Sequence, residues 1–396
     1  MTHGATGARI AEARPLWVGL LRLLALLLVA ALLLPWVRSP WFDLGGRWLY
    51  IFVLATAVAF LLTPVVRDIA WRTEILDVPA ARKVHVAPTP LLGGIAIHAA
   101  FCTALLANFV LDRETVAILV GGSLLVGVGI LDDRYGVPAA VKLAAQLGAT
   151  AVVMGAGVSL TLFPTRHLGL AANLVLTVVW IVGITNAMNF FDGMDGLATG
   201  LAILTAGFMG IVAFQTQQPS LGWLCIALVG ACLGFLPYNL RPGRPASIFL
   251  GDAGSPFLGF TLAALAVKGE WAESSFIDLA APVLIFWVFI FDMVHITVAR
   301  IATGKVHTFR QWIDYVGRDH LHHRLAALMG SQRLALLLIF LLSSVMGLAA
   351  VALKNARLLD AAALLIQAAL VVVVVTVLEF QGNRRARGIR EKDGGA

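Results

Sequence analysis

The sequence predicts an all-α fold, a polytopic helical bundle in a membrane with about 11–12 transmembrane helices. Composition is the first observation behind this prediction: 60% of the 396 residues are hydrophobic and only 13% are charged, whereas an average soluble domain carries about 25% charged residues. The second is the absence of the strict two-residue alternation that a membrane β-barrel requires. Lipid leaves the helix as the remaining way to satisfy backbone hydrogen bonds. A water-soluble globular enzyme is therefore excluded.

The helices are predicted from apolar runs bounded by charges or turn residues, because about 20 apolar residues cross a bilayer. The run at 254–267 is short, so a tilted, broken or re-entrant helix is an alternative there. The first run follows Arg9 and Arg14 as in a signal peptide, but it is too long and no cleavage site follows, so we expect a retained span. The twelve runs lie at about 16–36, 48–66, 91–110, 116–131, 139–160, 171–187, 197–214, 221–237, 254–267, 279–298, 334–353 and 361–380.

The distribution of Lys and Arg predicts the orientation of the bundle. The loops on one side, together with both termini, hold 20 of the 29 basic residues, and the opposite loops hold 7. The other two, Arg22 and Lys142, lie inside apolar runs. Because basic residues accumulate in cytoplasmic loops, the first side and both termini are expected to face the cytoplasm. The net charge of +7 is explained by anionic lipid, and no nucleic-acid partner is expected.

The predicted cytoplasmic loops carry the polar residues, whereas the opposite loops are short and chemically plain. Each of the polar clusters joins two predicted helices, which indicates one active site at the cytoplasmic membrane surface. The five clusters lie at 77–94, 132–134, 186–196, 249–255 and 318–324.

Three of these clusters, at 132–134, 186–196 and 249–255, supply acidic residues that could act as ligands. A carboxylate pair such as Asp132 and Asp133 at the end of an apolar run is costly unless it shares a cation or a proton; a solvated helix end is the simpler alternative. Further hard oxygen ligands, suited to Mg²⁺ or Mn²⁺ rather than zinc, come from Asn189, Asp192, Asp195 and Asp252. A divalent ion beside carboxylates and a basic loop is typical of phosphoryl-type transfer.

The last cluster combines three histidines, His320, His322 and His323, with Arg318 and Arg324. Flanking cations favour an anion-binding segment that suits a diphosphate. A metal site or a structural loop are the alternatives. Inside the tenth run, Asp292 and His295 are expected to tie helices together, with a role in the site as the alternative.

Together these clusters resemble the polyprenyl-phosphate N-acetylhexosamine-1-phosphate transferases, polytopic phosphoglycosyl transferases of glycosyltransferase family 4. All five occur in the family's order, over about 48–330, and the form His320-Leu-His322-His323-Arg324 is similar to the GlcNAc-1-phosphate branch. The resemblance implies a catalytic core at 48–333. An extra transmembrane helix and its flanks would precede it at 1–47, and two helices with a basic tail would follow at 334–396.

The same resemblance implies roles for individual residues. Asp252 would bind Mg²⁺, with Mn²⁺ as the alternative ion, and Asn189 would lie near the metal and the diphosphate. Asp132 would be the base or orienter for the lipid phosphate, with Asp133 as its partner. The implied catalytic residues are Asp132, Asp133, Asp252, His322 and His323. The implied substrate-binding residues are Lys83, His85, Asn189, Asp192, Asp195, Asn239, Phe249, Arg318, His320 and Arg324, with Phe249 stacking on uracil and the basic residues holding the diphosphate.

Three features depart from the family pattern. Position 136 is Gly, where the GlcNAc-1-phosphate branch often has a third Asp. The stretch from Lys305 to Gly317 is longer than usual and lacks the Ser-Pro-Phe of a loop that helps to recognise the sugar. The 16–36 run is an addition before the family's usual start. The sugar identity therefore stays open.

The implied reaction transfers a sugar-1-phosphate from a UDP-N-acetylhexosamine to undecaprenyl phosphate and releases UMP, as the first membrane step of cell-envelope polysaccharide synthesis. The implied location is the bacterial inner membrane, with a homodimer as an open question. One alternative is the phospho-MurNAc-pentapeptide transferase of peptidoglycan synthesis. The others are a lipid-linked sugar transporter, which would want ionisable groups near mid-membrane, and an inactive scaffold.

Overall fold

The computed structural model describes residues 16–79, 87–164, 166–271, 275–308, 311, 317, 319–353 and 356–393. Within these ranges the all-α prediction is confirmed, since a pair of two-residue strands is the only sheet in the described chain. The strands β1 (Leu76–Asp77) and β2 (Thr89–Pro90) pair antiparallel. The described helices are α1 (Leu16–Leu32), α2 (Pro35–Asp43), α3 (Arg47–Arg72), α4 (Gly93–Ala107), α5 (Arg113–Tyr135), α6 (Ala139–Gly155), α7 (His167–Phe191), α8 (Leu197–Gln215), α9 (Pro219–Asn239), α10 (Ser255–Lys268), α11 (Ser275–Ile285), α12 (Trp287–Ala302), α14 (Leu321–Met329), α15 (Gln332–Ala352) and α16 (Leu358–Asp393).

Every predicted apolar run corresponds to one helix or one bent pair of helices. In the described chain, seven helices are long and apolar enough to cross a membrane, or nine spans if each of two bent pairs counts as one. The three shorter apolar helices, α4, α6 and α10, account for the other three runs. The prediction of a polytopic helical membrane protein is therefore confirmed. The run at 254–267, for which a broken helix was an alternative, forms the continuous helix α10.

Two of the runs break where a single helix was predicted. The first run divides into α1 and α2, which meet at an angle of 77°. Leu34 is extended there (φ −77°, ψ 129°), because the ring of Pro35 disfavours the helical conformation in the residue before it. The tenth run divides into α11 and α12, bent by 75°. Phe286, between them, has φ −91° and ψ 12°, and α12 leaves the direction of α11 from that residue.

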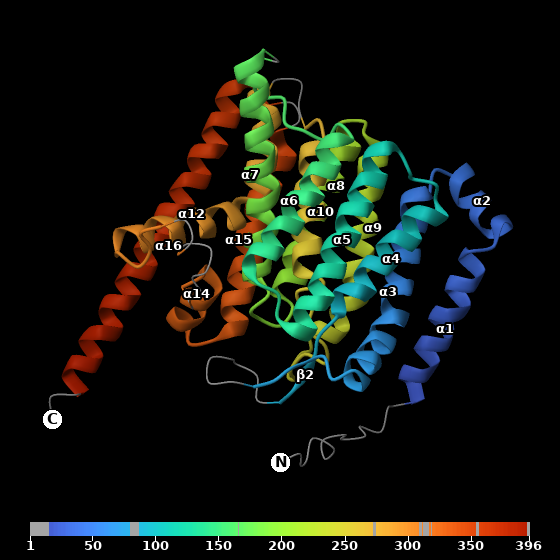
Figure 1. Cartoon of the computed structure of the whole chain (residues 1–396), viewed down its shortest axis with the longest axis horizontal. Helices are drawn as coiled ribbons and strands as arrows, with labels where there is room; N and C mark the ends of the chain where they lie inside the picture. The colour runs from blue at the N-terminus through green and yellow to red at the C-terminus, as the bar shows by residue number, and fades with distance from the viewer. Residues whose placement is uncertain are drawn as a thin grey trace.

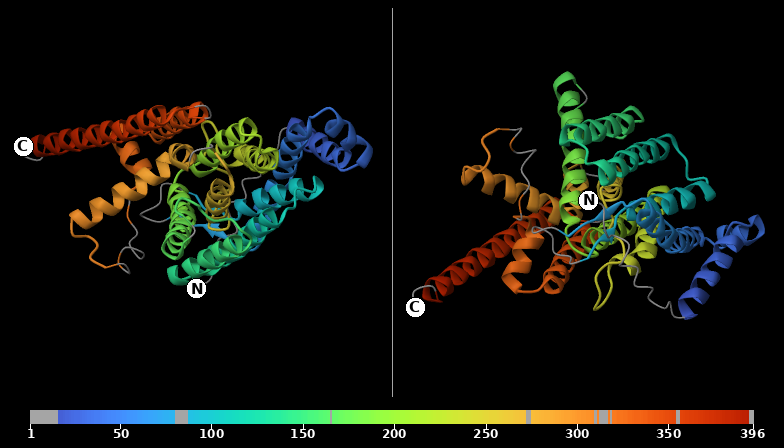
Figure 2. Two further views of the ribbon diagram at one scale, coloured as in Figure 1. Left: turned by 90° about the horizontal axis from the view of Figure 1, so that it is seen from above. Right: turned by 60° about the horizontal axis from the view of Figure 1, so that its bottom comes forward.

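Helix α10 lies at the centre of the bundle and packs against α4, α5, α7, α8 and α9 (Figure 1). Small residues allow the close helix contacts that membrane bundles use. In α9, for example, a Cβ added to Gly234 would lie 2.2 Å from the carbonyl oxygen of Thr56 in α3. Seen from above, α16 runs along one side of the bundle and α1 and α2 along the other (Figure 2).

The polar clusters collect at one end of this bundle. Helices α3, α5, α7 and α9 end there, and α4 and α10 begin there, beside the strand β2 (Figure 1). Helix α1 begins and α16 ends at the same end (Figure 1). The residues that precede and follow the central helix α10 are thus brought together with segments from the first half of the chain.

Candidate active site

The loop before α10 carries Asp252 and lies directly against the ends of two other helices. The backbone N–H groups of Gly93 and Gly94, at the start of α4, donate to the carbonyls of Phe249 and Leu250 at 3.0 and 2.9 Å. On α5, a Cβ added to Gly129 would lie 2.0 Å from the carbonyl oxygen of Asp252. Only glycine permits this approach, which brings the Asp252 loop onto the last turns of α5.

The carboxylate of Asp133 fixes this loop. Its Oδ1 accepts the N–H of Asp252 at 2.9 Å, and its Oδ2 accepts the N–H of Ala253 at 3.1 Å. Both oxygens are therefore used to hold the backbone on either side of the Asp252 side chain. Asp133 sets the position of Asp252, and its neighbour Asp132 is left to face the other polar groups of the cluster.

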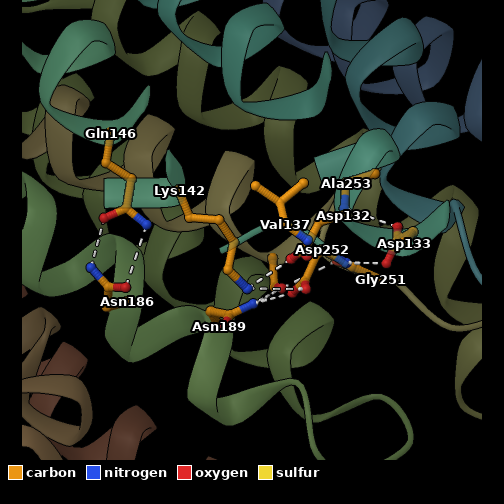
Figure 3. A network of polar contacts seen from close by, with 11 residues as sticks. Asp132, Asp133, Val137, Lys142, Gln146, Asn186, Asn189, Gly251, Asp252 and Ala253 are labelled. Carbon is orange, nitrogen blue, oxygen red and sulfur yellow. Dashed lines mark hydrogen bonds and ion pairs between the residues drawn. The ribbon is translucent and has the colours of Figure 1, made fainter. Parts of the chain in front are cut away.

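Four side chains from four segments form one hydrogen-bonded network (Figure 3). The Nζ of Lys142, from α6, lies 2.7 Å from Oδ2 of Asp132 and 3.6 Å from Oδ2 of Asp252. From the last turn of α7, Asn189 donates to Oδ1 of Asp252 at 2.6 Å and to Oγ of Ser255 at 3.0 Å. The ammonium group thus lies between two carboxylates that are 120 positions apart in the chain.

Deeper in the bundle, an amide pair joins the two helices that carry Lys142 and Asn189. The side chain of Asn186 donates to Oε1 of Gln146 at 2.7 Å, and Gln146 donates back to Oδ1 of Asn186 at 3.4 Å (Figure 3). The pair lies one turn inward from Lys142 on α6 and from Asn189 on α7. It therefore fixes the relative height of the two polar side chains above it.

The turn that leads from Asp132 to Lys142 explains one departure from the family pattern. Gly136 has φ +71°, a left-handed conformation that glycine adopts without strain. The chain reverses there, so that the N–H of Val137 donates to Oδ1 of Asp132 at 2.5 Å. A third Asp at position 136 would be strained in this turn.

Asp132, Asn189 and Asp252 line a cleft of about 920 Å³, and Lys142 contacts two of them. Its walls include nine of the predicted site residues: Asp132, Asp133, Asn189, Asp192, Asp195, Asn239, Phe249, Asp252 and His323. Arg241, Arg244 and Arg333 also line it. The cleft thus brings together residues from all five polar clusters, with Asp77 and Leu91 from the first, as the sequence predicted, and places cationic side chains in the same cavity as the carboxylates.

Electrostatics in the cleft favour a bound cation. Burial raises the pKa of Asp252 to about 6, and its hydrogen bond with Asp132 acts in the same direction. Burial also raises the pKa of Asp192 well above its ordinary value, reinforced by the charges of Asp252 and Asp133. The Lys142 ammonium group lies 2.7 Å from Asp132 and 3.6 Å from Asp252. A further cation bound beside these buried carboxyls would favour their ionised form.

Two predicted residues support the walls of the cleft from within. Asn239 is buried, and its Oδ1 accepts from the N–H of Gly196 at 3.1 Å and from Thr199 Oγ1 at 3.0 Å. Its amide donates to the carbonyl of Ile248 at 3.2 Å. Asp195 accepts the N–H of Ala246 at 2.8 Å. Together they fix the start of α8 to the segment that ends at Phe249.

The structure places the remaining predicted residues elsewhere. His320, His322 and Arg324 are behind the cleft wall, and His322 is only 1% exposed. Burial lowers the pKa of His322 well below its ordinary value, so the ring is neutral at pH 7. Asp292 ties α12 to α14 through His320, as predicted. Lys83, His85 and Arg318 lie outside the described residues.

Lys142 is the one central residue that the sequence prediction missed. In the sequence, Lys142 is only an isolated charge inside the apolar run at 139–160. That isolation was itself the signal, because an ionisable residue within a membrane segment pairs with another charge or marks a functional site.

The donor set suits a hard divalent cation. Mg²⁺ in phosphate-transfer sites usually takes one or two carboxylates and completes its octahedron with substrate oxygens and water. Asp132 and Asp252 both approach Lys142 Nζ, and the amide of Asn189 contacts Asp252. Among the described residues, no group of three or more His, Cys, Asp or Glu side chains is arranged to hold a metal. The residues present therefore fit an ion shared with substrate phosphates.

The fold and the cleft define a class: a polytopic membrane protein with a carboxylate-rich site at one end of its helical bundle. Comparison with known proteins gives the family. The sequence profile of glycosyl transferase family 4 matches residues 115–270. A probable undecaprenyl-phosphate N-acetylglucosaminyl 1-phosphate transferase of Bacillus subtilis (strain 168) is 34% identical over 311 residues, which is 77% of this chain and 84% of the relative.

Two further relatives agree. A decaprenyl-phosphate N-acetylglucosaminephosphotransferase of Mycobacterium tuberculosis (strain ATCC 25618 / H37Rv) is 32% identical over 82% of this chain and 87% of its own length. An undecaprenyl-phosphate alpha-N-acetylglucosaminyl 1-phosphate transferase of Escherichia coli (strain K12) is 28% identical over 75% of this chain and 80% of its own length. The chain belongs to glycosyl transferase family 4, on the side of the N-acetylglucosamine-1-phosphate transferases.

Proposed function

We propose that the protein transfers N-acetylglucosamine-1-phosphate from UDP-N-acetylglucosamine to undecaprenyl phosphate or a similar polyprenyl phosphate, and releases UMP. The observation that carries this proposal is the network of Asp132, Lys142, Asn189 and Asp252, three of which line one cleft. A phosphate acceptor needs a cation, and a diphosphate donor needs a second one. This network supplies one ammonium group together with carboxylates that would bind a metal ion. The names of the relatives support the sugar and the acceptor.

On the acceptor side, the Lys142 ammonium neutralises charge on the lipid phosphate, and Asp132 orients that ammonium at 2.7 Å. When the acceptor is a monoanion, Asp132 also accepts its remaining proton. A phosphate oxygen then attacks the β-phosphorus of the donor, and the bond from that phosphorus to the oxygen bridging to the α-phosphorus breaks. The bridging oxygen leaves with UMP, and the product is a polyprenyl diphosphate sugar. Positioning and charge neutralisation account for most of the catalysis in this type of reaction.

On the donor side, Asp252 and Asn189 would hold Mg²⁺, or Mn²⁺ as the alternative. When bound, that ion neutralises charge on the donor diphosphate. Asp133 holds the loop of Asp252 in place through two backbone N–H groups. Phe249 lines the cleft and provides an aromatic surface for the uracil ring. Asp192 and Asp195 contact the nucleotide or the sugar, and His323 faces the diphosphate.

We further propose that the cleft faces the cytoplasm of a bacterial inner membrane. The end of the bundle that carries the cleft is the end where α1 begins and α16 ends (Figure 1), and the sequence assigns both termini to the side with the 20 basic residues of the charge bias. An acceptor whose polyprenyl tail stays in the bilayer reaches this end sideways from lipid, and a water-soluble nucleotide sugar reaches it from the cytoplasm.

The test uses the full-length protein, purified in detergent and supplied with Mg²⁺ and undecaprenyl phosphate. UMP release is measured for a panel of UDP-sugars. We expect UDP-N-acetylglucosamine to be the preferred donor, and Asp252→Asn to abolish release. UMP release from no member of the panel would overturn the proposed function. UMP release with preference for UDP-MurNAc-pentapeptide would replace it by the peptidoglycan reaction.

A further inference from the structure

Asp292, on α12, is fully buried and bonds to the start of the histidine helix α14. Its Oδ2 lies 2.8 Å from Nδ1 of His320, and its Oδ1 accepts the backbone N–H of Leu321 at 2.6 Å. Leu321 is the first residue of α14, so this second bond satisfies an N–H that has no partner within the helix. A single carboxylate therefore fixes both the side chain of the N-cap residue and the beginning of α14.

A second contact holds the same segment from the same helix. The buried guanidinium of Arg300, also on α12, binds Asp319 in bidentate fashion, with Nε to Oδ2 at 2.9 Å and Nη2 to Oδ1 at 2.8 Å. Asp292 and Arg300 lie eight residues apart, about 12 Å along the helix. Residues 319–321 are thus attached to α12 at two points, and α12 is the half-helix that follows the 75° break.

These contacts determine where the next two histidines lie. The ring of His320 stacks on Phe190 with centroids 4.5 Å apart, and the ring of His322 lies 5.6 Å from that of Phe191. Phe190 and Phe191 are the last two residues of α7, directly before Asp192. A Cβ added to Gly193 would lie 2.8 Å from Nε2 of His322. The imidazole of His322 therefore packs against the backbone of the segment that carries Asp192.

His322 holds an unused hydrogen-bonding capacity at this position. Both of its ring nitrogens are buried without a hydrogen-bond partner in the part of the chain that the structure describes. An unpaired polar ring buried at this depth is costly unless a ligand or a moving segment completes it. His323, the next residue, lines the cleft itself, and its ring lies against that of His322 in a tilted arrangement with centroids 4.1 Å apart.

We propose that Asp292 is a positioning residue for sugar-phosphate transfer. By fixing the tautomer of His320 and the first turn of α14, it holds His322 and His323 against the acidic cleft. The inference deepens the proposed function and relies on it for the kinetic part of its test. Asp292 contacts no substrate, and its effect passes through the histidines.

The choice of a carboxylate follows from the two bonds that it accepts. An ionised carboxylate only accepts hydrogen bonds, so the ring proton of His320 must be on Nδ1 when it points at Asp292. An amide at position 292 has one oxygen. If that oxygen keeps the N–H of Leu321, the NH₂ group faces Nδ1 of His320 and forces the ring proton onto Nε2. Asp292→Asn therefore preserves the size of the side chain and the helix cap and reverses the tautomer of His320, and it also removes the charge that lies 3.9 Å from Arg324.

A matched control separates this effect from a general loss of stability. Asn173, on α7, is equally buried and forms two bonds with one backbone residue: it accepts the N–H of Phe163 at 3.0 Å and donates to its carbonyl at 2.9 Å. It lies at the opposite end of α7 from the cleft. Asn173→Asp removes the donated bond and is expected to cost stability without reaching the histidines.

The experiment compares wild-type protein, Asp292→Asn and Asn173→Asp by thermal unfolding, by kcat and KM for the UDP-sugar, and by ¹⁵N NMR of the histidine rings. Removing the partner that orients a metal-ligating histidine typically costs about 10–100-fold in affinity or activity, and we take the same order of effect for these histidines. We expect Asp292→Asn to lower kcat about 10–100-fold with KM changed less than about threefold, and to shift the ring nitrogens of His320, His322 and His323. Asn173→Asp should keep kcat and these resonances.

The inference is overturned if Asp292→Asn leaves kcat within twofold of wild type. It is also overturned if the histidine resonances of Asp292→Asn match those of wild type. The same holds if Asn173→Asp, with a similar fall in Tm, loses as much activity as Asp292→Asn. Failure of the proposed function would look different, because the wild-type protein would then release no UMP. In that case the histidine resonances still test whether Asp292 positions the histidines. A shift in Asp292→Asn alone supports that role, and no shift overturns it.

Discussion

Asp133 accepts the backbone N–H of Asp252 at 2.9 Å across 119 positions of sequence. Its second oxygen accepts the next N–H along the chain. The adjacent carboxylates at the end of α5 thus have different roles. Asp133 holds the loop of Asp252 in place, and Asp132 contacts Lys142. This division explains why two neighbouring acids occupy one helix end, where a single solvated residue would have been enough.

The first prediction concerns Asp133 itself. Asp133→Asn can accept one of the two N–H groups, but its NH₂ then faces the other donor. We expect kcat to fall at least about tenfold, because a buried N–H left without a partner costs about 1–3 kcal/mol and the loop can move to satisfy it. Steady-state UMP release measures the effect. Unchanged kcat in a correctly folded Asp133→Asn protein would contradict the anchoring role.

The second prediction concerns the contact between α5 and the Asp252 loop. In Gly129→Ala, the new Cβ would lie 2.0 Å from the carbonyl oxygen of Asp252, so the backbone must shift. We expect a loss of about 1–3 kcal/mol of stability together with loss of transfer activity. Gly127→Ala, two residues earlier on α5, is the control, since nothing lies within 4 Å of its added Cβ. Equal activities of the two variants would refute the packing argument.

The third prediction concerns Lys142. Lys142→Met removes the cation between Asp132 and Asp252 while keeping most of the side-chain length. Loss of one preorganised charge at a reacting centre typically costs about 10²–10³ in kcat, and we expect a loss of that size. Lys268→Met is the matched control, because Lys268 also pairs with two acids, Asp112 and Glu114, at the opposite end of the bundle. Retained activity in Lys142→Met would exclude Lys142 from the acceptor site.

The fourth prediction concerns pH and metal binding. The pKa of Asp252 is raised to about 6 in the metal-free protein, so this carboxyl is increasingly protonated as the pH falls below 6, and a protonated carboxyl does not ligate Mg²⁺. We expect affinity for Mn²⁺, used as a probe, to fall up to about tenfold per pH unit below 6 and to level off above 7. Titration calorimetry of the wild-type protein measures this. The alternative outcome, an affinity that is flat from pH 5 to 8, would exclude Asp252 as a ligand.

Much of the fold and of the cleft could be predicted from the sequence. Apolar runs of helical length allow few structures in lipid, so each run corresponds to a helix or a bent pair. The polar clusters alternate with these runs, so their residues had to meet at one end once the helices were antiparallel. The break between α1 and α2 also had a local signal, because Pro35 disfavours a helical conformation at Leu34.

Other features depend on tertiary contacts that no local pattern encodes. The break at Phe286 lies one turn after Pro282, and a proline ring disrupts the turn before it and not the turn in which this break occurs. The two N–H partners of Asp133 come from a loop in the second half of the chain, so its anchoring role could not be read from the pair of acids alone. The histidine cluster was predicted as one binding segment, but among its described residues only His323 lines the cleft, because Asp292 and Arg300 hold the start of α14 behind the wall.

The most direct test of the central claim follows the β-phosphorus of the donor. Purified protein, Mg²⁺ and undecaprenyl phosphate are incubated with UDP-N-acetylglucosamine labelled with ³²P at the β-phosphate, and lipid and water phases are separated. We predict that the label moves to the lipid as the sugar does, while unlabelled UMP appears in the water phase in equal amount. Label that stays in water as UDP while the sugar enters the lipid, or no transfer of either, would contradict the account.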